Sequence, residues 1–303
     1  MRLVTRSDFD GLACAVLLRS IDLIEEYKFS HPKDLQDGLV AVTENDVLAN
    51  VPYVKGCGMW FDHHSSEQER VSGEQFEGSS KLAPSCARVI WDYYGGRDSF
   101  PAALEPMMEA VDKVDSANLS REEIIRPSGW VLLGMIMDPR TGLGRYRDYR
   151  ISNYQLMLDM INYCAEMKVE DILEIPDVKE RTDRYFSQQR DFVLMLQRCS
   201  RLDGNVLLID LRNEAEIFSG NRFTVYALYP EANVSIQIIW GLRQQNVVLT
   251  VGHSILKRGC TADIGSLMLS HGGGGHFQVG TCQVPVEKAE RTIKEVVAAL
   301  KGK

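Results

Sequence analysis

The feature that most constrains the fold is the order of apolar segments in the first sixty residues of the chain. Residues 2–5 (RLVT) have the composition of a short buried strand, and residues 11–27 have the apolar periodicity of a helix. Residues 27–31, 38–43 and 57–61 have the composition of further strands. A helix placed between strands is typical of a parallel sheet, because parallel neighbours need a long crossover connection. The sequence therefore predicts an α/β fold built on a parallel sheet.

Acidic residues follow three of these predicted strands, at the points where the strands end. Ligands of an open parallel sheet bind just beyond the carboxyl ends of its strands, so these side chains could meet in one crevice. Carboxylates that are buried together are costly unless a cation compensates them. A ligand set of many carboxylates and few imidazoles favours Mn²⁺ or Mg²⁺ over Zn²⁺, which prefers sulfur and nitrogen ligands. The residues are Asp8 and Asp10 after the first strand, Glu44 and Asp46 after residues 38–43, and Asp62, His63 and His64 after residues 57–61.

Each of these segments also has a simpler explanation when it is taken alone. Residues 8–11 (DFDG) are rich in turn-forming residues, and two adjacent histidines can lie in a solvated turn. Asp46 could cap a helix that begins at Val47. Acids at three strand ends favour a metal site over these explanations. Two ions about 3.5–4 Å apart would bind a phosphoryl group and activate a water for attack.

The helical and strand patterns place a domain boundary near residue 200. Residues 84–112, 150–175 and 176–200 have helical patterns, and the last of them is polar over most of its length. We predict a parallel-sheet domain over 1–185, a helical linker over 186–200, and a smaller C-terminal α/β domain over 201–303. The C-terminal elements are the strands NVLLIDL, FTVYALYP, NVSIQIIWG and QNVVLTVGHSI, and helices near 261–270 and 287–301.

Bulk properties narrow the class of partner and the compartment. The formal net charge of −8 disfavours binding to long nucleic acids or to anionic membranes. No apolar run approaches the ~20 residues that span a bilayer, and the chain opens on charged residues rather than on a secretory signal. The seven cysteines are scattered without a CxxC pair, which fits free thiols in a reducing compartment. We expect a cytoplasmic protein with no membrane partner. The oligomeric state stays open, with a homodimer as one option.

Residues 271–276 (HGGGGH) place four glycines between two histidines. Glycines allow a ligand to approach the backbone closely, and consecutive amides can bind an anion. A helix exit and turn would explain one or two glycines, but not four. Two further stretches, VGHSILKRG and DPRTGLGRYRDYR, could add phosphate contacts, although solvated loops and exposed ion pairs explain their basic residues at least as well. The candidate substrate-binding residues are Gly273, Gly274, Gly275, His276, His253 and Arg140.

Three stretches together resemble one enzyme family. DFDG followed by a predicted helix, WFDHHSSE, and SHGGGGHFQVG resemble the DHH family of phosphoesterases with its C-terminal DHH-associated domain. The resemblance covers nearly the whole chain and is similar in style to the subgroup of exopolyphosphatase-related and linear-dinucleotide phosphodiesterase proteins. It implies a DHH catalytic domain, a C-terminal substrate-binding domain, and two Mn²⁺ ions, with Mg²⁺ or Co²⁺ as substitutes.

The resemblance also implies roles for individual residues. Asp8 would bind the first metal, and Asp10 and His63 the second. Asp62 belongs to the same triplet, and His64 would face the scissile phosphate. Asp46 is the best match for a bridging aspartate, with Glu44 in reserve. Asp115, which Ser116 follows, is the best match for the aspartate of the fourth motif, with Asp112 in reserve.

The chain departs from the family pattern near its first motif. Many members carry a histidine a few residues before the first aspartate, or an acid two residues before it. Val4 and Arg6 stand near those positions here. Arginine stays protonated and cannot ligate a metal. Arg6 therefore either leaves the first metal site with fewer ligands or contributes to catalysis through a phosphate contact.

The resemblance and the acidic charge together predict the substrate. We expect Mn²⁺-dependent hydrolysis of short linear nucleotides, such as pGpG or other di- and oligoribonucleotides, to nucleoside monophosphates. The alternatives within the family are an exopolyphosphatase and a phosphoadenosine phosphate phosphatase. A non-enzymatic alternative is a nucleotide-binding sensor that has lost catalysis, which only Arg6 favours.

Overall fold

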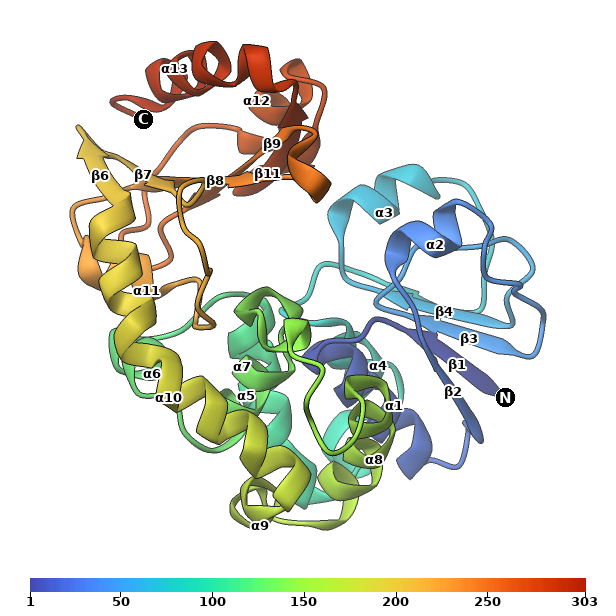
Figure 1. The fold of residues 1–303 in the computed structure, drawn as a ribbon. Helices are drawn as coiled ribbons and strands as arrows, with labels where there is room; N and C mark the ends of the chain where they lie inside the picture. The colour runs from blue at the N-terminus through green and yellow to red at the C-terminus, as the bar shows by residue number, and fades with distance from the viewer. The chain divides into compact units, whose positions relative to one another are not determined.

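The computed structural model describes residues 1–303, apart from the side chains of Ser65, Ser66 and Glu69. The chain divides into two compact units. Unit 1 comprises Met1–Asn118 and Arg126–Phe186, and unit 2 comprises Leu119–Ile125 and Ser187–Lys303. The long helix α10 (Pro176–Cys199) runs from one unit into the other (Figure 1). Residues 186–199 of the predicted linker are thus a continuation of a helix that starts in unit 1; their function as a linker stays a prediction.

Unit 1 contains the parallel sheet that the sequence predicts. Its five strands lie in the order β2-β1-β3-β4-β5, and every neighbouring pair is parallel. The order reverses between β1 and β3, and ligands of such sheets bind at the carboxyl ends of the strands beside this point. The strands are β1 (Arg2–Thr5), β2 (Glu26–Phe29), β3 (Asp46–Ala49), β4 (Met59–Asp62) and β5 (Gly78–Ser80).

Helices cover both faces of this sheet, so consecutive residues in the middle of its central strands are apolar and buried. Leu3 and Val4 are consecutive residues on β1, and both are fully buried. In Figure 1, α2 (Pro32–Gln36) and α3 (Ser65–Arg70) lie on one face of the sheet, and α1 (Phe9–Ser20) and α4 (Cys86–Tyr93) lie on the other. The remaining helices of the unit are α5 (Glu105–Asp115), α7 (Gly129–Met137), α8 (Asn153–Glu166) and α9 (Val169–Glu174).

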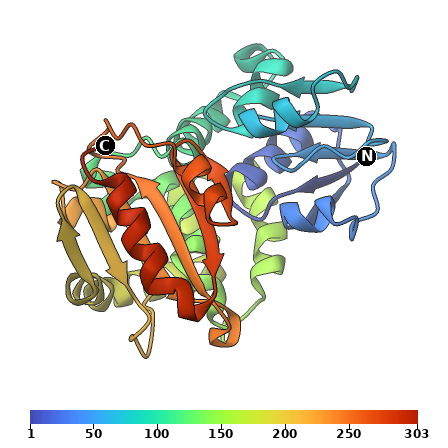
Figure 2. The same cartoon turned by 90° about the horizontal axis from the view of Figure 1, so that it is seen from above.

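Unit 2 is a smaller α/β unit, as expected, with a mixed sheet in the order β10-β11-β9-β8-β7-β6. Only the β7–β8 pair is parallel. The helices α12 and α13 lie beside this sheet (Figure 2). Their residues Ile264, Met268, Ile293 and Val296 belong to the buried core of the unit. The elements are β6 (Ser200–Asp203), β7 (Val206–Asp210), β8 (Val234–Trp240), β9 (Val247–His253), β10 (Gly274–His276), β11 (Val279–Val284), α6 (Arg121–Ile125), α11 (Thr224–Leu228), α12 (Ile264–Ser270) and α13 (Ala289–Leu300).

Two predicted strands are wrong. Residues 38–43 lie in a turn region, where Gly38 has a φ of 70° and Leu39 is 73 % exposed; the strand here is β3, which begins only at Asp46. FTVYALYP contains α11 instead of a strand. Three consecutive residues of that segment are buried, and the Tyr226 hydroxyl donates to the Gly252 carbonyl of β9, so the segment packs beside the sheet rather than within it.

The predicted helix over 84–112 is broken into α4 and α5. Gly95 and Gly96 have φ values of 97° and 62°, which end α4, and Pro101 precedes the next helical turn. All seven cysteines are free thiols. Across the described chain, no helix combines the length and the apolar composition needed to cross a membrane.

Candidate metal centre

The candidate site lies at the carboxyl ends of β1 and β4, where the sequence predicts acids. Asp8 follows β1 and caps α1, because its carboxylate accepts the Gly11 amide at 3.0 Å. A Cβ on Gly11 would lie 1.9 Å from the Arg6 carbonyl oxygen. Only glycine therefore lets the strand turn so sharply into the helix, which explains the DFDG sequence.

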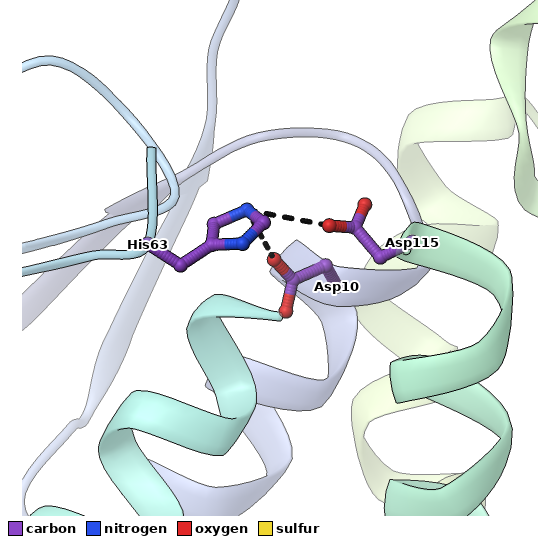
Figure 3. A group of neighbouring side chains, drawn as sticks. All are labelled: Asp10, His63 and Asp115. Carbon is purple, nitrogen blue, oxygen red and sulfur yellow. Dashed lines mark ion pairs between the residues drawn. The ribbon is translucent and has the colours of Figure 1, made fainter. Parts of the chain in front are cut away.

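Three side chains converge beyond the sheet edge. Asp10, His63 and Asp115 each place one ligand atom within 4.8 Å of the others (Figure 3). The His63 Nε2 atom lies 3.3 Å from Asp115 Oδ2 and 3.8 Å from Asp10 Oδ2. The three residues come from α1, from the segment after β4, and from the last residue of α5. Two carboxylates and one imidazole are a suitable partial ligand set for a divalent cation.

The orientation of the His63 ring supports this assignment. Its Nδ1 atom lies 3.1 Å from the Ala83 carbonyl, which can only accept, so we assign the proton to Nδ1. Its Nε2 atom is buried and has no hydrogen-bond partner among the described residues. A carbonyl behind a ligating histidine is a common way to fix the ring and its tautomer. The lone pair on the buried Nε2 atom therefore faces two carboxylates, and a cation between them would satisfy all three groups.

Asp10 is held by the N-terminus of another helix. The amides of Cys86 and Ala87, the first residues of α4, donate to its two carboxylate oxygens at 2.9 and 2.8 Å. Burial nevertheless raises the pKa of Asp10 to about 7, and the charge of Asp8 adds to this effect, although the two amides lower it. The pKa of Asp115 is also raised to about 7, first by burial and then by the charge of Asp10. The described side chains therefore do not fully compensate the negative charge of these two carboxylates, and a divalent cation would do so.

Asp62 and His64 form a second pair beside this cluster. One Asp62 oxygen accepts both the His64 backbone amide and the His64 Nδ1 proton, each at 2.7 Å. Burial lowers the pKa of His64, but the hydrogen bond and charge of Asp62 outweigh it, so the net shift is upward. His64 is therefore oriented and biased towards its charged form by the buried Asp62 carboxylate.

Asp8 has partners of its own. Arg6 Nε lies 2.9 Å from Asp8 Oδ2, and Asn50 Nδ2 donates to Asp8 Oδ1 at 3.2 Å. Asn50 follows β3 directly and is 3 % exposed. The sequence interpretation missed Asn50, although it is the first polar residue after the apolar run VLA. It was missed because the strand was expected earlier in the chain.

Asp46 lies at the start of β3, not at its carboxyl end where the candidate site is. The prediction that Asp46 follows a strand and bridges the metal ions is therefore wrong. Asp46 begins β3 and pairs in register with Arg2, to which it is also bound by an ion pair of 2.6 Å. The Arg2 and Thr43 hydrogen bonds lower the pKa of Asp46 despite its burial. The metal-facing end of β3 is Ala49, three residues further on. Glu44, its reserve, precedes the strand and is exposed.

The structure also distinguishes the two acids of α5. Asp112 accepts from Ser85 Oγ at 2.7 Å and from Arg88 at 2.9 and 2.7 Å, so its oxygens are engaged in a tie to α4. Asp115 lies one turn further on and joins the cluster with Asp10 and His63. This geometry favours Asp115 over Asp112 as a ligand, as the sequence interpretation preferred.

A cationic side chain borders the cluster. A small pocket is lined by Asp8, Asp10, Asp115, Asp138 and Arg140, together with apolar side chains. The Asp138 carboxylate accepts the Arg140 amide at 2.8 Å and Arg140 Nε at 2.7 Å, which fixes the guanidinium at the pocket. The sequence suggested Arg140 but not Asp138, whose carboxylate sets its position.

The other candidate residues lie in unit 2. His253 ends β9, and its Nε2 atom lies 2.9 Å from the Ala262 carbonyl; burial lowers its pKa. A Cβ on Gly273 would lie 2.1 Å from the Thr281 carbonyl, and one on Gly275 would lie 2.2 Å from the Val279 carbonyl. A side chain at either position would clash with the backbone of β11, so close packing against that strand explains these two glycines. A Cβ on Gly274 would meet nothing within 4 Å. His276 is exposed on β10.

Comparison with protein-family models and with curated protein sequences finds no match. Solved structures do match. The pGpG-specific phosphodiesterase PggH from Vibrio cholerae is 47 % identical, with a TM-score of 0.86, over 99 % of this chain and 98 % of that one. The DHH domain of a protein described as a member of the s1p family of ribosomal proteins has a TM-score of 0.58 at 12 % identity, over 99 % of this chain and 87 % of that one.

Two further structures share the fold at low identity. An exopolyphosphatase-related protein from Bacteroides fragilis has a TM-score of 0.52 at 14 % identity, over 99 % of this chain and 91 % of that one. RecJ from Thermus thermophilus, solved in complex with Mn²⁺, has a TM-score of 0.53 at 11 % identity, over 98 % of this chain and 51 % of that one. The parallel sheet, the acids and paired histidines at its edge, and the near full-length likeness to PggH lead to one assignment: the chain belongs to the DHH family of phosphoesterases.

Proposed function

We propose that this protein is a divalent-cation-dependent phosphodiesterase that cleaves pGpG and similar short linear nucleotides to nucleoside monophosphates. The observation that carries the proposal is the 47 % identity to a pGpG-specific phosphodiesterase over nearly the full length of both chains. The side chains at the sheet edge supply the chemistry that such an activity needs.

Asp10, His63 and Asp115 are the proposed ligands of the cation, with Mn²⁺ as the preferred ion and Mg²⁺ or Co²⁺ as substitutes. A bound divalent cation neutralises phosphate charge and lowers the pKa of water. The α4 amides hold Asp10, and the Ala83 carbonyl holds the His63 ring, so these side chains need little rearrangement to bind the ion. We propose that Asp8 and Asp62 border the ion and hold Arg6 and His64 in place beside it.

Charged side chains around the cluster are the proposed substrate contacts. His64, oriented by Asp62, donates a hydrogen bond from its ring to a phosphate oxygen and stabilises the charge that develops there. Arg6 and Arg140 are each held by a neighbouring carboxylate and present their guanidinium groups to phosphate. The pairing with Asp8 and Asp138 limits the conformational freedom that each arginine loses on binding.

A second group of proposed contacts lies in unit 2. Gly274 has open space beside its Cα atom, which would let a nucleotide approach the backbone. His276 and His253 are proposed to assist at the same face of unit 2, together with the backbone of Gly273 and Gly275. The net charge of −8 supports a short substrate, because each added phosphate increases repulsion from an acidic protein. We place the activity in the cytoplasm, where seven free thiols would stay reduced.

A substrate panel tests the proposal. The metal-free protein is supplied with Mn²⁺ and given pGpG, pApA, longer oligoribonucleotides, cyclic dinucleotides, phosphoadenosine phosphate or polyphosphate, and initial rates are compared. We expect the highest kcat/KM on a linear dinucleotide and no cleavage with chelator present. A higher kcat/KM on polyphosphate or phosphoadenosine phosphate would replace the proposed substrate. Binding of pGpG without cleavage under every metal condition would favour a sensor.

A further inference from the structure

The surroundings of Asp8 differ from those of Asp10 in a way that bears on the number of metal ions. We infer that the centre holds one divalent cation, at Asp10, His63 and Asp115, and that the Arg6 guanidinium takes the place beside Asp8 where a second cation would otherwise bind. This replaces the two ions that the sequence predicts. The chemical purpose of the arrangement rests on the proposed function, whereas the ion count can be measured without it.

The carboxylate of Asp8 is already surrounded by donors. Its Oδ2 atom lies 2.9 Å from Arg6 Nε, and its Oδ1 atom accepts from the Gly11 amide at 3.0 Å and from Asn50 Nδ2 at 3.2 Å. Asp8 is 7 % exposed. A cation bound here would displace these donors and would then face a permanent positive charge at close range. The carboxylate is therefore compensated without a metal.

Asn50 occupies the position from which a further acid could have served this side of the centre. It follows β3 directly, between the strands that carry Asp8 and Asp62. Its amide is neutral, and its nitrogen points to the Asp8 carboxylate. Among the described side chains, Asp10, His63 and Asp115 form a metal-binding group of three, and Asp8 belongs to no such group. The structure thus offers one set of converging ligands, not two.

Arg6 can supply part of what a second cation would supply. A guanidinium stays charged at any physiological pH, and its planar edge suits a phosphate oxygen. The ion pair with Asp8 engages Nε, and the side chain is 38 % exposed, so it is within reach of a ligand as well as of Asp8. The centre would then combine one exchangeable cation with one fixed cation. Metal titration should therefore show a single class of site.

Metal counting tests the inference directly. Metal-free protein is dialysed to equilibrium against rising Mn²⁺, and manganese per chain is measured by mass spectrometry, with calorimetric titration as a second estimate of stoichiometry. We expect one ion per chain in the wild type and a loss of at least about tenfold in affinity in His63→Ala, because the free Nε2 ligand is removed. Two ions per chain of similar affinity in the wild type would overturn the inference.

A double variant tests the cause. Arg6→Ala with Asn50→Asp removes the fixed charge and adds a carboxylate beside Asp8, so the count should rise to two ions per chain. Arg19→Ala is the matched control, because Arg19 lies in the last turn of α1, the helix that Asp8 caps, and pairs with the exposed Glu166. Its count should stay at one. If the folded double variant still binds one ion, Arg6 and Asn50 do not exclude the second. Should that variant fail to fold, the single variants Arg6→Ala and Asn50→Asp decide the point by the same count.

Cleavage of pGpG is measured on the same wild-type preparations so that the two proposals can fail separately. Two bound ions with cleavage would overturn the single-ion inference and leave the proposed function intact. One bound ion without cleavage of any short nucleotide would do the reverse.

Discussion

The tie between α4 and α5 should set both the stability of unit 1 and the affinity of the metal centre. Asp112 accepts from Ser85 Oγ and twice from Arg88, at 2.7, 2.9 and 2.7 Å. Asp10 is bound to the first amides of α4, and Asp115 lies one turn after Asp112 on α5. The Asp112 side chain therefore fixes the distance between two proposed metal ligands that come from different elements.

Asp112→Ala removes all three hydrogen bonds. Bonds to charged groups contribute about 1.5–3 kcal/mol each, but these three share one acceptor group and are not additive. The two charged side chains are 19 % and 26 % exposed, so water partly replaces the lost contacts. We expect a loss of about 2–3 kcal/mol in the free energy of unfolding. We expect the misplaced ligands to cost about 1.4 kcal/mol of Mn²⁺ binding free energy, which corresponds to a tenfold weaker affinity.

Urea denaturation of the metal-free protein measures the stability term, and Trp91 on α4 is a local reporter that lies 5.8 Å from the Arg88 guanidinium. Calorimetric titration measures Mn²⁺ affinity. Asp92→Ala is the matched control, since Asp92 lies on α4 and the change removes only its exposed ion pair with Lys81. It should cost less than about 1 kcal/mol. If Asp112→Ala behaves like this control in both assays, the tie does not position the ligands.

Three further perturbations address pH, the glycines and substrate length. Because the pKa values of Asp10 and Asp115 are raised to about 7, the folded metal-free protein holds more protons than the unfolded chain between about pH 4 and 7. Its stability should therefore fall as pH rises through that window. Calorimetry should show Mn²⁺ affinity rising from about pH 6 to 8, with proton release on binding. Flat profiles would show that these carboxylates ionise normally. Gly273→Ala should lower the melting temperature, since its Cβ would meet the Thr281 carbonyl, whereas Gly274→Val should fold normally but bind pGpG more weakly; the opposite pattern would make Gly274 structural. Rates should fall steeply as an RNA substrate grows beyond a few nucleotides, and equal rates on a dinucleotide and a long RNA would favour an exonuclease.

Much of the site could be predicted from local sequence because its residues belong to short contiguous segments. DFDG contains the residue that caps α1 and a glycine with no room for a side chain beside the Arg6 carbonyl. In WFDHH the two histidines directly follow a buried strand. Both signals are local, so the spacing alone indicated them. The parallel order of the sheet followed from the helix between strands.

The residues that were missed are fixed by contacts distant in sequence. Asn50 meets Asp8 across 42 positions, and Cys86 meets Asp10 across 76 positions, so no periodicity or spacing indicates either contact. Asp46 was misplaced because the turn-rich segment before it resembles a strand in composition. In that segment the choice between strand and turn was decided by packing against neighbouring elements rather than by intrinsic preference.

The central claim is that Asp10, His63 and Asp115 hold the cation at which a short linear nucleotide is bound for cleavage. A crystal of the protein with Mn²⁺ and a pGpG analogue whose bridging linkage resists hydrolysis, measured at the manganese absorption edge, tests it most directly. We predict an anomalous peak at about 2.0–2.3 Å from one oxygen of each aspartate and from His63 Nε2, with the bridging phosphate of the analogue beside it. A manganese peak remote from these three side chains, or an analogue bound with its phosphate away from the ion, would contradict the account.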